Sequence, residues 1–388
     1  MEKYIPYGRQ DISSEDVNEV VQVLKSDFLT QGPAVPKFEK DLIELTGAKF
    51  ALATNSATSA LHIACSAIGI GSEDTVWTSP ISFVASSNCA LYCGASIDFV
   101  DIDPLTNNIS IDALKEKLKL AAENDNLPKA IIPVHLAGLS SDMKQIKELS
   151  NIYNFKIIED ASHAVGGKYS GKKIGCCQYS DFCVFSFHPV KIIATGEGGA
   201  LLTNIPELAL KAELHRSHGI TKDQTDFIKE ADGPWYYEQQ ELGYNYRMTD
   251  IQAALGSSQL KRINQFIKKR KKVFNFYLNH LKGLPLILPH QIQEDHSSHH
   301  LFIVKLDAQK SKISHGELFR SLRERGVGVN LHYIPIYRHP YYKENFCFNE
   351  SDFPEAEKYY STAISLPIFY KLEKSDLEYI CNIFQELL

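Results

Sequence analysis

The chain has 388 residues, of which 44% are hydrophobic and 23% charged, and its formal net charge is −6. This length suits one large domain with a smaller one, and the acidic balance argues against a nucleic-acid-binding protein, whose surface is normally basic. No run approaches the ~20 apolar residues of a membrane span, and Met1–Pro6 has no apolar signal core. Eight scattered cysteines form no CxxC pair and no zinc spacing. We therefore expect a cytoplasmic protein with reduced cysteines and without a metal.

Helical and strand patterns alternate through the first 200 residues. Ser13–Asp16 caps a helix whose apolar residues share one face, namely Val17, Val20, Val21 and Leu24. A second helix carries Phe38 and Leu42 and ends at Gly47. Strands are predicted near 50–53, 75–78, 96–100, 129–134, 155–158, 182–187 and 200–203. This alternation indicates an α/β fold, with a mainly parallel sheet between helices.

The pattern changes after Thr249. A long helical run from Ile251 to about Leu281 is predicted to lead into a smaller C-terminal α+β domain. We expect an N-terminal segment at 1–30 that packs on the small domain, a large domain at 31–260 and the small domain at 261–388. The basic run 268–272 lies within the helical pattern, so we interpret it as a solvated helix face.

Small polar residues follow the first predicted strand. Asn55–Ser59 leads into a helix at 60–68, and the amides at a helix start can bind a phosphate with help from the hydroxyls. Helix capping alone explains the same residues equally well.

Two further strand ends carry residues suited to a cofactor. Asp160 ends an apolar strand, where a buried carboxylate could hold a pyridinium nitrogen protonated or could simply cap a turn. Lys191 lies between an apolar strand and Gly196–Gly199. Burial there would free its amine for a Schiff base, although most lysines are surface charges. Phe83 follows the second strand and could stack on a flat ring or lie in the core.

Together these motifs resemble the DegT/DnrJ/EryC1/StrS family of sugar aminotransferases, from about Tyr7 to the C-terminus. The resemblance implies the type I, or aspartate-aminotransferase-like, fold and the cofactor pyridoxal 5′-phosphate. It is carried by Leu29–Gly32, Asn55–His62, Thr78–Ala85, Glu159–Ala164, Phe185–Lys191, Arg216–Ile220, Gly243–Met248 and His332–Tyr333.

The resemblance also implies roles for individual residues. Lys191 is the implied catalytic residue and Schiff-base lysine, and Asn245 is implied to reach the neighbouring subunit's site in a homodimer with shared active sites. The implied cofactor-binding residues are Thr58, Ser59, Phe83, Asp160, His163, Ser186, Lys191 and Asn245. The implied substrate-binding residues are Tyr7, Asp27, Phe28, Leu29, Thr30, Ala57, Ser186, Asn245, Asn330, Leu331, His332 and Tyr333.

The implied reaction is amino transfer from L-glutamate, which becomes 2-oxoglutarate, to C4 of a UDP-linked 4-keto-6-deoxy-N-acetylhexosamine. Three places depart from the pattern: Ile192, Ile334 and Ile368–Phe369 stand where relatives carry other residues. They leave a different UDP- or dTDP-linked keto-sugar as an alternative. A dehydratase of the same cofactor class is disfavoured because such relatives replace the lysine with histidine. A non-catalytic regulatory protein on this fold is the alternative from another class.

Overall fold

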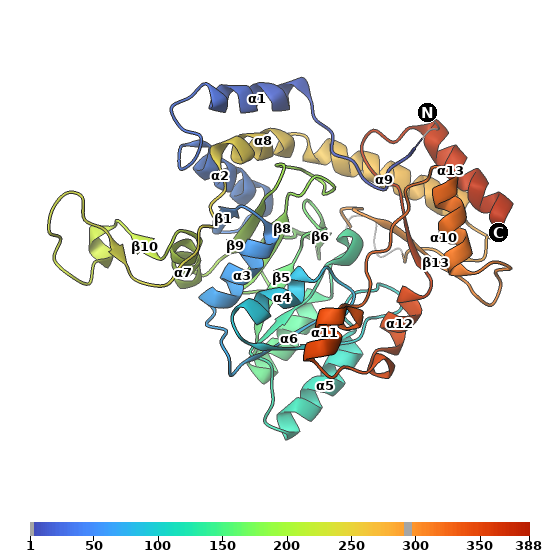
Figure 1. Cartoon of the computed structure of the whole chain (residues 1–388), viewed down its shortest axis with the longest axis horizontal. Helices are drawn as coiled ribbons and strands as arrows, with labels where there is room; N and C mark the ends of the chain where they lie inside the picture. Colours follow the sequence, from blue (N-terminus) through green and yellow to red (C-terminus); the bar gives the residue numbers. More distant parts are fainter. Residues whose placement is uncertain (1–3, 291–296) are drawn as a thin grey trace.

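A seven-stranded sheet forms the centre of the larger part of the molecule (Figure 1) in the computed structural model, which describes residues 4–290 and 297–388. Its order is β1-β9-β8-β5-β4-β2-β3. Strand β9 runs antiparallel to both neighbours, and the other adjacent pairs are parallel. The bounds are β1 Phe50–Thr54, β2 Thr75–Thr78, β3 Ser96–Phe99, β4 Ala130–Ile132, β5 Lys156–Asp160, β8 Phe182–Ser186 and β9 Gly199–Thr203. The predicted mainly parallel sheet is confirmed.

Helices cover both faces of this sheet because successive strand residues point to opposite sides. On β5, Ile158 packs in the core with α3 (Ala57–Ala67), α4 (Ala85–Tyr92) and α7 (Pro206–Arg216). Ile157 packs on the other face with α5 (Ile111–Glu123) and α6 (Met143–Tyr153). That second face is completed by α2 (Ala34–Thr46) and α8 (Asp250–Leu260). Short elements join these layers: η1 Leu136–Gly138, β6 Lys168–Tyr169 and β7 Lys172–Lys173.

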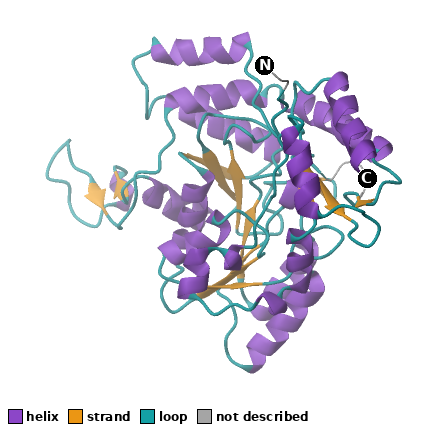
Figure 2. Cartoon of the chain, turned by 45° about the vertical axis from the view of Figure 1, so that its right-hand side comes forward, coloured by secondary structure: helices purple, strands orange, loops and turns teal. Residues whose placement is uncertain are grey.

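A smaller α+β unit lies beside the sheet (Figure 2). Its antiparallel strands are β12 (Leu286–Ile287), β13 (Phe302–Leu306) and β14 (Ala363–Leu366), and its helices are α9 (Ile263–His280), α10 (His315–Glu324) and α13 (Lys374–Leu387). Between β13 and β14 come α10, η3 (Ile336–Arg338), α11 (Pro340–Asn345), η4 (Glu350–Asp352) and α12 (Pro354–Tyr360). Ile5 joins its apolar core and bridges to Val327. The domain boundaries stay predictions, and residues 1–3 and 291–296 lie outside the described residues.

Helix α1 (Ser14–Leu24) lies along α8 (Figure 1) and begins with a capping box between Ser13 and Asp16. The cap was predicted. The apolar face is less buried than the pattern suggests, because Val17 is 52% and Leu24 55% exposed.

Two sequence interpretations need correction. The predicted helix 251–281 is broken at residues 261–262, between α8 and α9. The break lets the Arg262 guanidinium bind Asp11 at 2.6 Å and Asp16 at 2.5 Å. The basic run 268–272 is not a uniformly solvated face either, since Arg270 is only 3% exposed. Its guanidinium donates to the carbonyl oxygens of His300 and Ile368, both at 3.0 Å, and burial lowers its pKa to about 10.

An arm formed by residues 220–241 projects from the molecule (Figure 1). It contains β10 (Ile220–Thr221), η2 (Gln224–Asp226) and β11 (Glu238–Gln239). Ile228 is 80% and Trp235 75% exposed on it.

No helix within residues 4–290 and 297–388 has both the length and the apolarity to cross a membrane. All eight cysteines are free, and five of them are buried.

Candidate active site

A cavity of about 880 Å³ opens where the parallel strands end. This is the edge at which open α/β sheets bind ligands. The predicted site residues that line it are Tyr7, Ala57, Thr58, Ser59, Phe83, Asp160, His163, Ser186, Lys191, Asn330, Leu331, His332 and Tyr333. The structure therefore brings together residues from four strand ends, the N-terminal segment and the small unit.

Lys191 enters the cavity from the connection between β8 and β9. Its backbone N–H donates to the carbonyl of His188 at 2.8 Å, which fixes the turn. Burial lowers the pKa of the Lys191 ammonium to about 8, and the nearby Asp160 carboxylate opposes that shift. About a tenth of this amine is therefore free at pH 7, far more than for an ordinary lysine, as a nucleophile or a base requires.

Asp160 ends β5 and is 5% exposed. Its strand is held between β4 and β8, and its Oδ1 accepts the backbone N–H of Ser162 at 3.1 Å. Its Oδ2 accepts the hydroxyl of Ser86 on α4 at 2.6 Å. Sequence reasoning missed Ser86. The signal for Ser86 in the sequence was weak: its hydroxyl comes four residues after that of Ser82, at the start of a helix that follows the end of a strand.

The turn after β1 caps helix α3 and also lines the cavity. Ser56 caps α3 by accepting the Ser59 N–H at 3.1 Å, and the Ser59 hydroxyl donates to Asn55 Oδ1 at 2.6 Å. Thr58 and Ser186 also line the cavity. Gly199 lies so close that a Cβ there would stand 2.4 Å from the Ala57 amide nitrogen. Glycine is therefore required if this turn is to keep its place at the helix N-terminus, where amides favour an anion.

His163 and Tyr333 form a directed pair in the cavity wall. The Ala137 N–H donates to His163 Nδ1 at 3.3 Å, so the proton of the neutral ring sits on Nε2. Nε2 lies 3.0 Å from the Tyr333 hydroxyl oxygen, which therefore accepts it. Burial holds the pKa of His163 well below its usual value, and the nearby positive charge of Lys191 lowers it further. The phenol keeps its own proton available as a donor.

The remaining cavity wall is aromatic and weakly charged. His332 Nδ1 lies 2.9 Å from the Ser365 hydroxyl, and burial lowers the pKa of His332 to about 3. Phe83 is 58% exposed with its ring centroid 6.1 Å from that of Tyr333, so it is not a core residue. Among the described lining residues, Lys191 is the single lysine and there is no arginine.

Five predicted residues lie outside the cavity of their own chain. Asp27, Phe28, Leu29 and Thr30 form an exposed segment that is held by the bond from the Asp250 N–H to the Leu29 carbonyl. Asn245 is exposed beside the base of the arm, where it bridges to Ser217.

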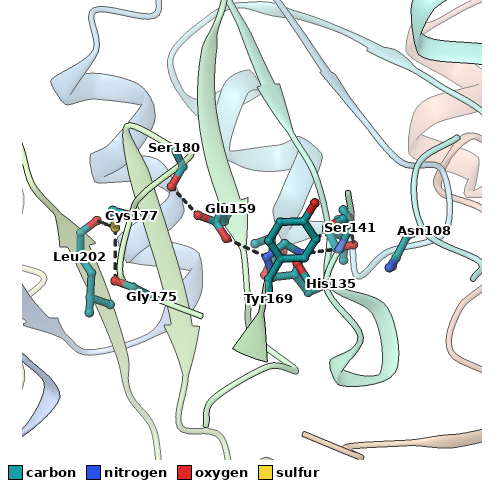
Figure 3. Close-up of polar contacts among 12 residues, drawn as sticks. Asn108, His135, Ser141, Glu159, Tyr169, Gly175, Cys177, Ser180 and Leu202 are labelled. Carbon is teal, nitrogen blue, oxygen red and sulfur yellow. Dashed lines mark hydrogen bonds and ion pairs between the residues drawn. The ribbon is translucent and has the colours of Figure 1, made fainter. Parts of the chain in front are cut away.

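A second polar cluster lies at Glu159, on the face of β5 opposite to Asp160 (Figure 3). Glu159 accepts from the Ser180 hydroxyl and lies 2.8 Å from His135 Nε2. The Ser141 N–H donates to His135 Nδ1 at 3.2 Å, so Nε2 carries the proton toward Glu159. None of these side chains lines the cavity, and their hydrogen bonds join β5, the strand that carries Asp160, to the segments around His135 and Ser180.

Comparisons with known proteins agree with this geometry. Residues 10–385 match the DegT/DnrJ/EryC1/StrS aminotransferase family. A UDP-4-amino-4,6-dideoxy-N-acetyl-beta-L-altrosamine transaminase of Campylobacter jejuni is 37% identical over 97% of this chain and 95% of its own. The structure of Helicobacter pylori PseC, an aminotransferase of pseudoaminic acid biosynthesis, matches with a TM-score of 0.90 and 33% identity over 99% of each chain.

A second similar structure is the PLP form of the sugar aminotransferase Spr1654 from Streptococcus pneumoniae, with a TM-score of 0.87 and 27% identity over 99% of this chain and 100% of that chain. The cavity fits pyridoxal phosphate on its own chemistry. It combines an amine of lowered pKa, a buried carboxylate and a helix N-terminus kept open by Gly199. The chain therefore belongs to the DegT/DnrJ/EryC1/StrS aminotransferase family and is a pyridoxal-phosphate-dependent sugar aminotransferase.

Proposed function

We propose that this enzyme transfers an amino group from L-glutamate to C4 of UDP-2-acetamido-2,6-dideoxy-β-L-arabino-hex-4-ulose, a step of pseudaminic acid biosynthesis. The observation that carries the chemistry is the Lys191 amine, of pKa about 8, in one cavity with the buried Asp160 carboxylate. The choice of sugar is supported by the 37% identical Campylobacter jejuni transaminase and by the similar fold of PseC.

Each side chain then has a defined task. Lys191 would hold the cofactor covalently, and Asp160 would bind its ring nitrogen. Phe83 and His163 would contact the ring, and Thr58 and Ser59 at the start of α3, together with Ser186, would bind its phosphate. When bound, pyridoxal phosphate supplies an electron sink for the pair of electrons left when a C–H bond is broken.

Lys191 also moves protons. Once displaced by a substrate amine, the free ε-amine of Lys191 would take the proton from the α-carbon of the donor as a base and would then give that proton up as an acid. A pKa near the working pH suits both steps. The donor leaves as 2-oxoglutarate before the keto-sugar enters, so ping-pong kinetics are expected.

A homodimer with shared active sites completes this proposal. A sugar nucleotide and a cofactor phosphate bring several negative charges to a cavity whose described wall has one lysine and no arginine. Meanwhile, Asn245, the 27–30 segment and the arm present exposed polar and apolar side chains outside their own cavity. A second copy that contributes these residues would add hydrogen-bonding and apolar contacts to the bound sugar nucleotide. We place the dimer in the cytoplasm, where the eight free cysteines stay reduced.

Replacing the lysine tests the chemistry directly. Purified Lys191→Ala should lose the visible absorbance of covalently held cofactor and all turnover, because no other lysine lines the described cavity wall. Lys268→Ala, an exposed lysine on α9, is the control and should keep both. Turnover retained by Lys191→Ala would refute the assignment.

The substrate is tested with a panel of UDP- and dTDP-linked keto-sugars. We expect mass spectrometry to find the amino-sugar product with the named UDP-4-keto-sugar and 2-oxoglutarate from L-glutamate. Preference for another keto-sugar is the second candidate function. It is favoured by the departures at Ile334 and Ile368–Phe369, since the C-terminal segment contributes Asn330–Tyr333 to the cavity.

A further inference from the structure

We propose that Ser86 is a positioning residue that, together with Ser82, holds the Asp160 carboxylate charged and thereby keeps the ring nitrogen of the cofactor protonated. The proposal deepens the proposed function and rests on its placement of the cofactor between Lys191 and Asp160.

A chain of three oxygens runs from the cavity wall to the carboxylate. Ser82 Oγ lies 2.6 Å from Ser86 Oγ, which lies 2.6 Å from Asp160 Oδ2. The exposed fractions are 3% for Ser82, 0% for Ser86 and 5% for Asp160. Water therefore has little access to these bonds.

The direction of these hydrogen bonds is fixed by chemistry. An ionised carboxylate only accepts, so Ser86 gives its single hydroxyl proton to Asp160. Its oxygen can then only accept from Ser82, so the protons point from Ser82 to Ser86 to Asp160. Successive donation in one direction strengthens each bond.

The type of donor matters for the cofactor. A buried carboxylate needs hydrogen-bond donors or a cation to remain charged. Asp160 receives two neutral donors, the Ser86 hydroxyl and the Ser162 amide. A hydroxyl stabilises the negative charge without supplying a competing positive charge, so the ring nitrogen remains the partner cation. It also does not titrate in the working range, so its effect does not change with pH.

Removing this donor should have a defined spectroscopic effect. Without the Ser86 hydroxyl, the Asp160 carboxylate is less well stabilised as an anion, so the ring nitrogen of the cofactor is protonated to a smaller extent. The nitrogen that joins Lys191 to the cofactor then loses its proton less easily. We expect the pH midpoint of the visible absorbance of Ser86→Ala holoenzyme to move up by about 0.5 unit or more. We also expect kcat to fall roughly 3- to 10-fold with KM for the keto-sugar little changed.

Ser87 provides a matched control on the same helix. It is also 0% exposed, but its hydroxyl lies 2.6 Å from the Tyr342 hydroxyl and does not bond Asp160. Ser87→Ala should therefore keep the wild-type midpoint. Ser86→Thr retains a hydroxyl and should restore both the midpoint and kcat. Ser82→Ala should shift the midpoint in the same direction by less.

The outcomes separate the two proposals. An unchanged midpoint and kcat in Ser86→Ala would overturn the role of Ser86. If Ser86→Ala does not hold the cofactor, the Ser82→Ala midpoint decides, and a wild-type value there overturns the relay. Wild-type protein that shows no titrating visible absorbance would instead overturn the proposed function.

Discussion

Two regions of the molecule are built in different ways. The floor is the part of the cavity wall formed by Asp160 and His163, and the rim is Asn245 with residues 27–30, which we place at the cavity of a second copy. On the floor, Asp160 and His163 each have both of their polar side-chain atoms bonded within the same chain. On the rim, Asn245 and the 27–30 segment are exposed and lie outside their own cavity. The contrast teaches that one chain suffices to prepare groups for chemistry, whereas holding a large charged substrate is a task that our proposal divides between two copies.

The largest effect is expected on the floor, from Asp160→Asn. An amide cannot balance a protonated ring nitrogen, so kcat should fall roughly 100- to 1000-fold. Glu159→Gln alters the neighbouring carboxylate on the other face of β5. It should keep kcat within about twofold while the Tm falls on the order of 5 °C. Equal losses of kcat in both variants would show that the two faces of β5 are not functionally separate.

A smaller effect is expected from Gly199→Ala at the phosphate turn. The new Cβ would meet the Ala57 amide nitrogen at 2.4 Å, so the turn must shift. Overpacking of this kind costs about 1–3 kcal/mol, equivalent to roughly 5- to 150-fold in the Kd for the cofactor. Fluorescence titration of apoprotein measures it, with Gly71→Ala as the control because open space surrounds Gly71. Equal Kd values would remove the argument for a close approach.

The pH dependence of cofactor capture probes Lys191 alone. Only the neutral amine reacts, so the capture rate of apoprotein should rise about tenfold per pH unit and level off near pH 8, the pKa of Lys191. Between this value and the ordinary pKa of 10.5, the unfolded chain binds more protons, so apoprotein stability should rise with pH in that window. Stopped-flow absorbance measures the rate. A rise that continues to pH 10 would mean a solvated amine.

The rim is tested by mixing two inactive variants, Lys191→Ala and Asn245→Ala. If each site takes Lys191 from one copy and Asn245 from the other, half of the random dimers hold one intact site. Mixing after mild dissociation should then recover about a quarter of wild-type activity. No recovery, with mixed dimers confirmed by native mass spectrometry, would mean that both residues serve the site of one chain.

Most of the floor could be predicted from the sequence. The strand ends at Thr54, Asp160 and Ser186 follow from short apolar runs, and parallel strands bring their ends to one edge. The position of Lys191 after such a run is compatible with a surface charge as well, and its catalytic role follows from the resemblance to the family.

Long-range pairings could not be predicted from the sequence. Ser86 bonds a residue 74 positions away, and Arg262, at the break before α9, pairs with the distant Asp11 and Asp16. Likewise, Arg270 is buried because carbonyl oxygens from two distant segments converge on it. Local patterns carry no information about such partners.

The N-terminal segment has a consequence for how the protein is synthesised. Ile5 bonds Gly326 and Gly328, and the Tyr7 carbonyl accepts the Ile368 N–H at 3.0 Å. The seven-stranded sheet, by contrast, is complete by Thr203. Ile5 and Tyr7 must therefore wait until residues 326–368 have been synthesised before they can dock, and contacts of such long separation form slowly. Because Tyr7 lines the cavity, a nascent chain can assemble its sheet well before it can complete its cavity wall.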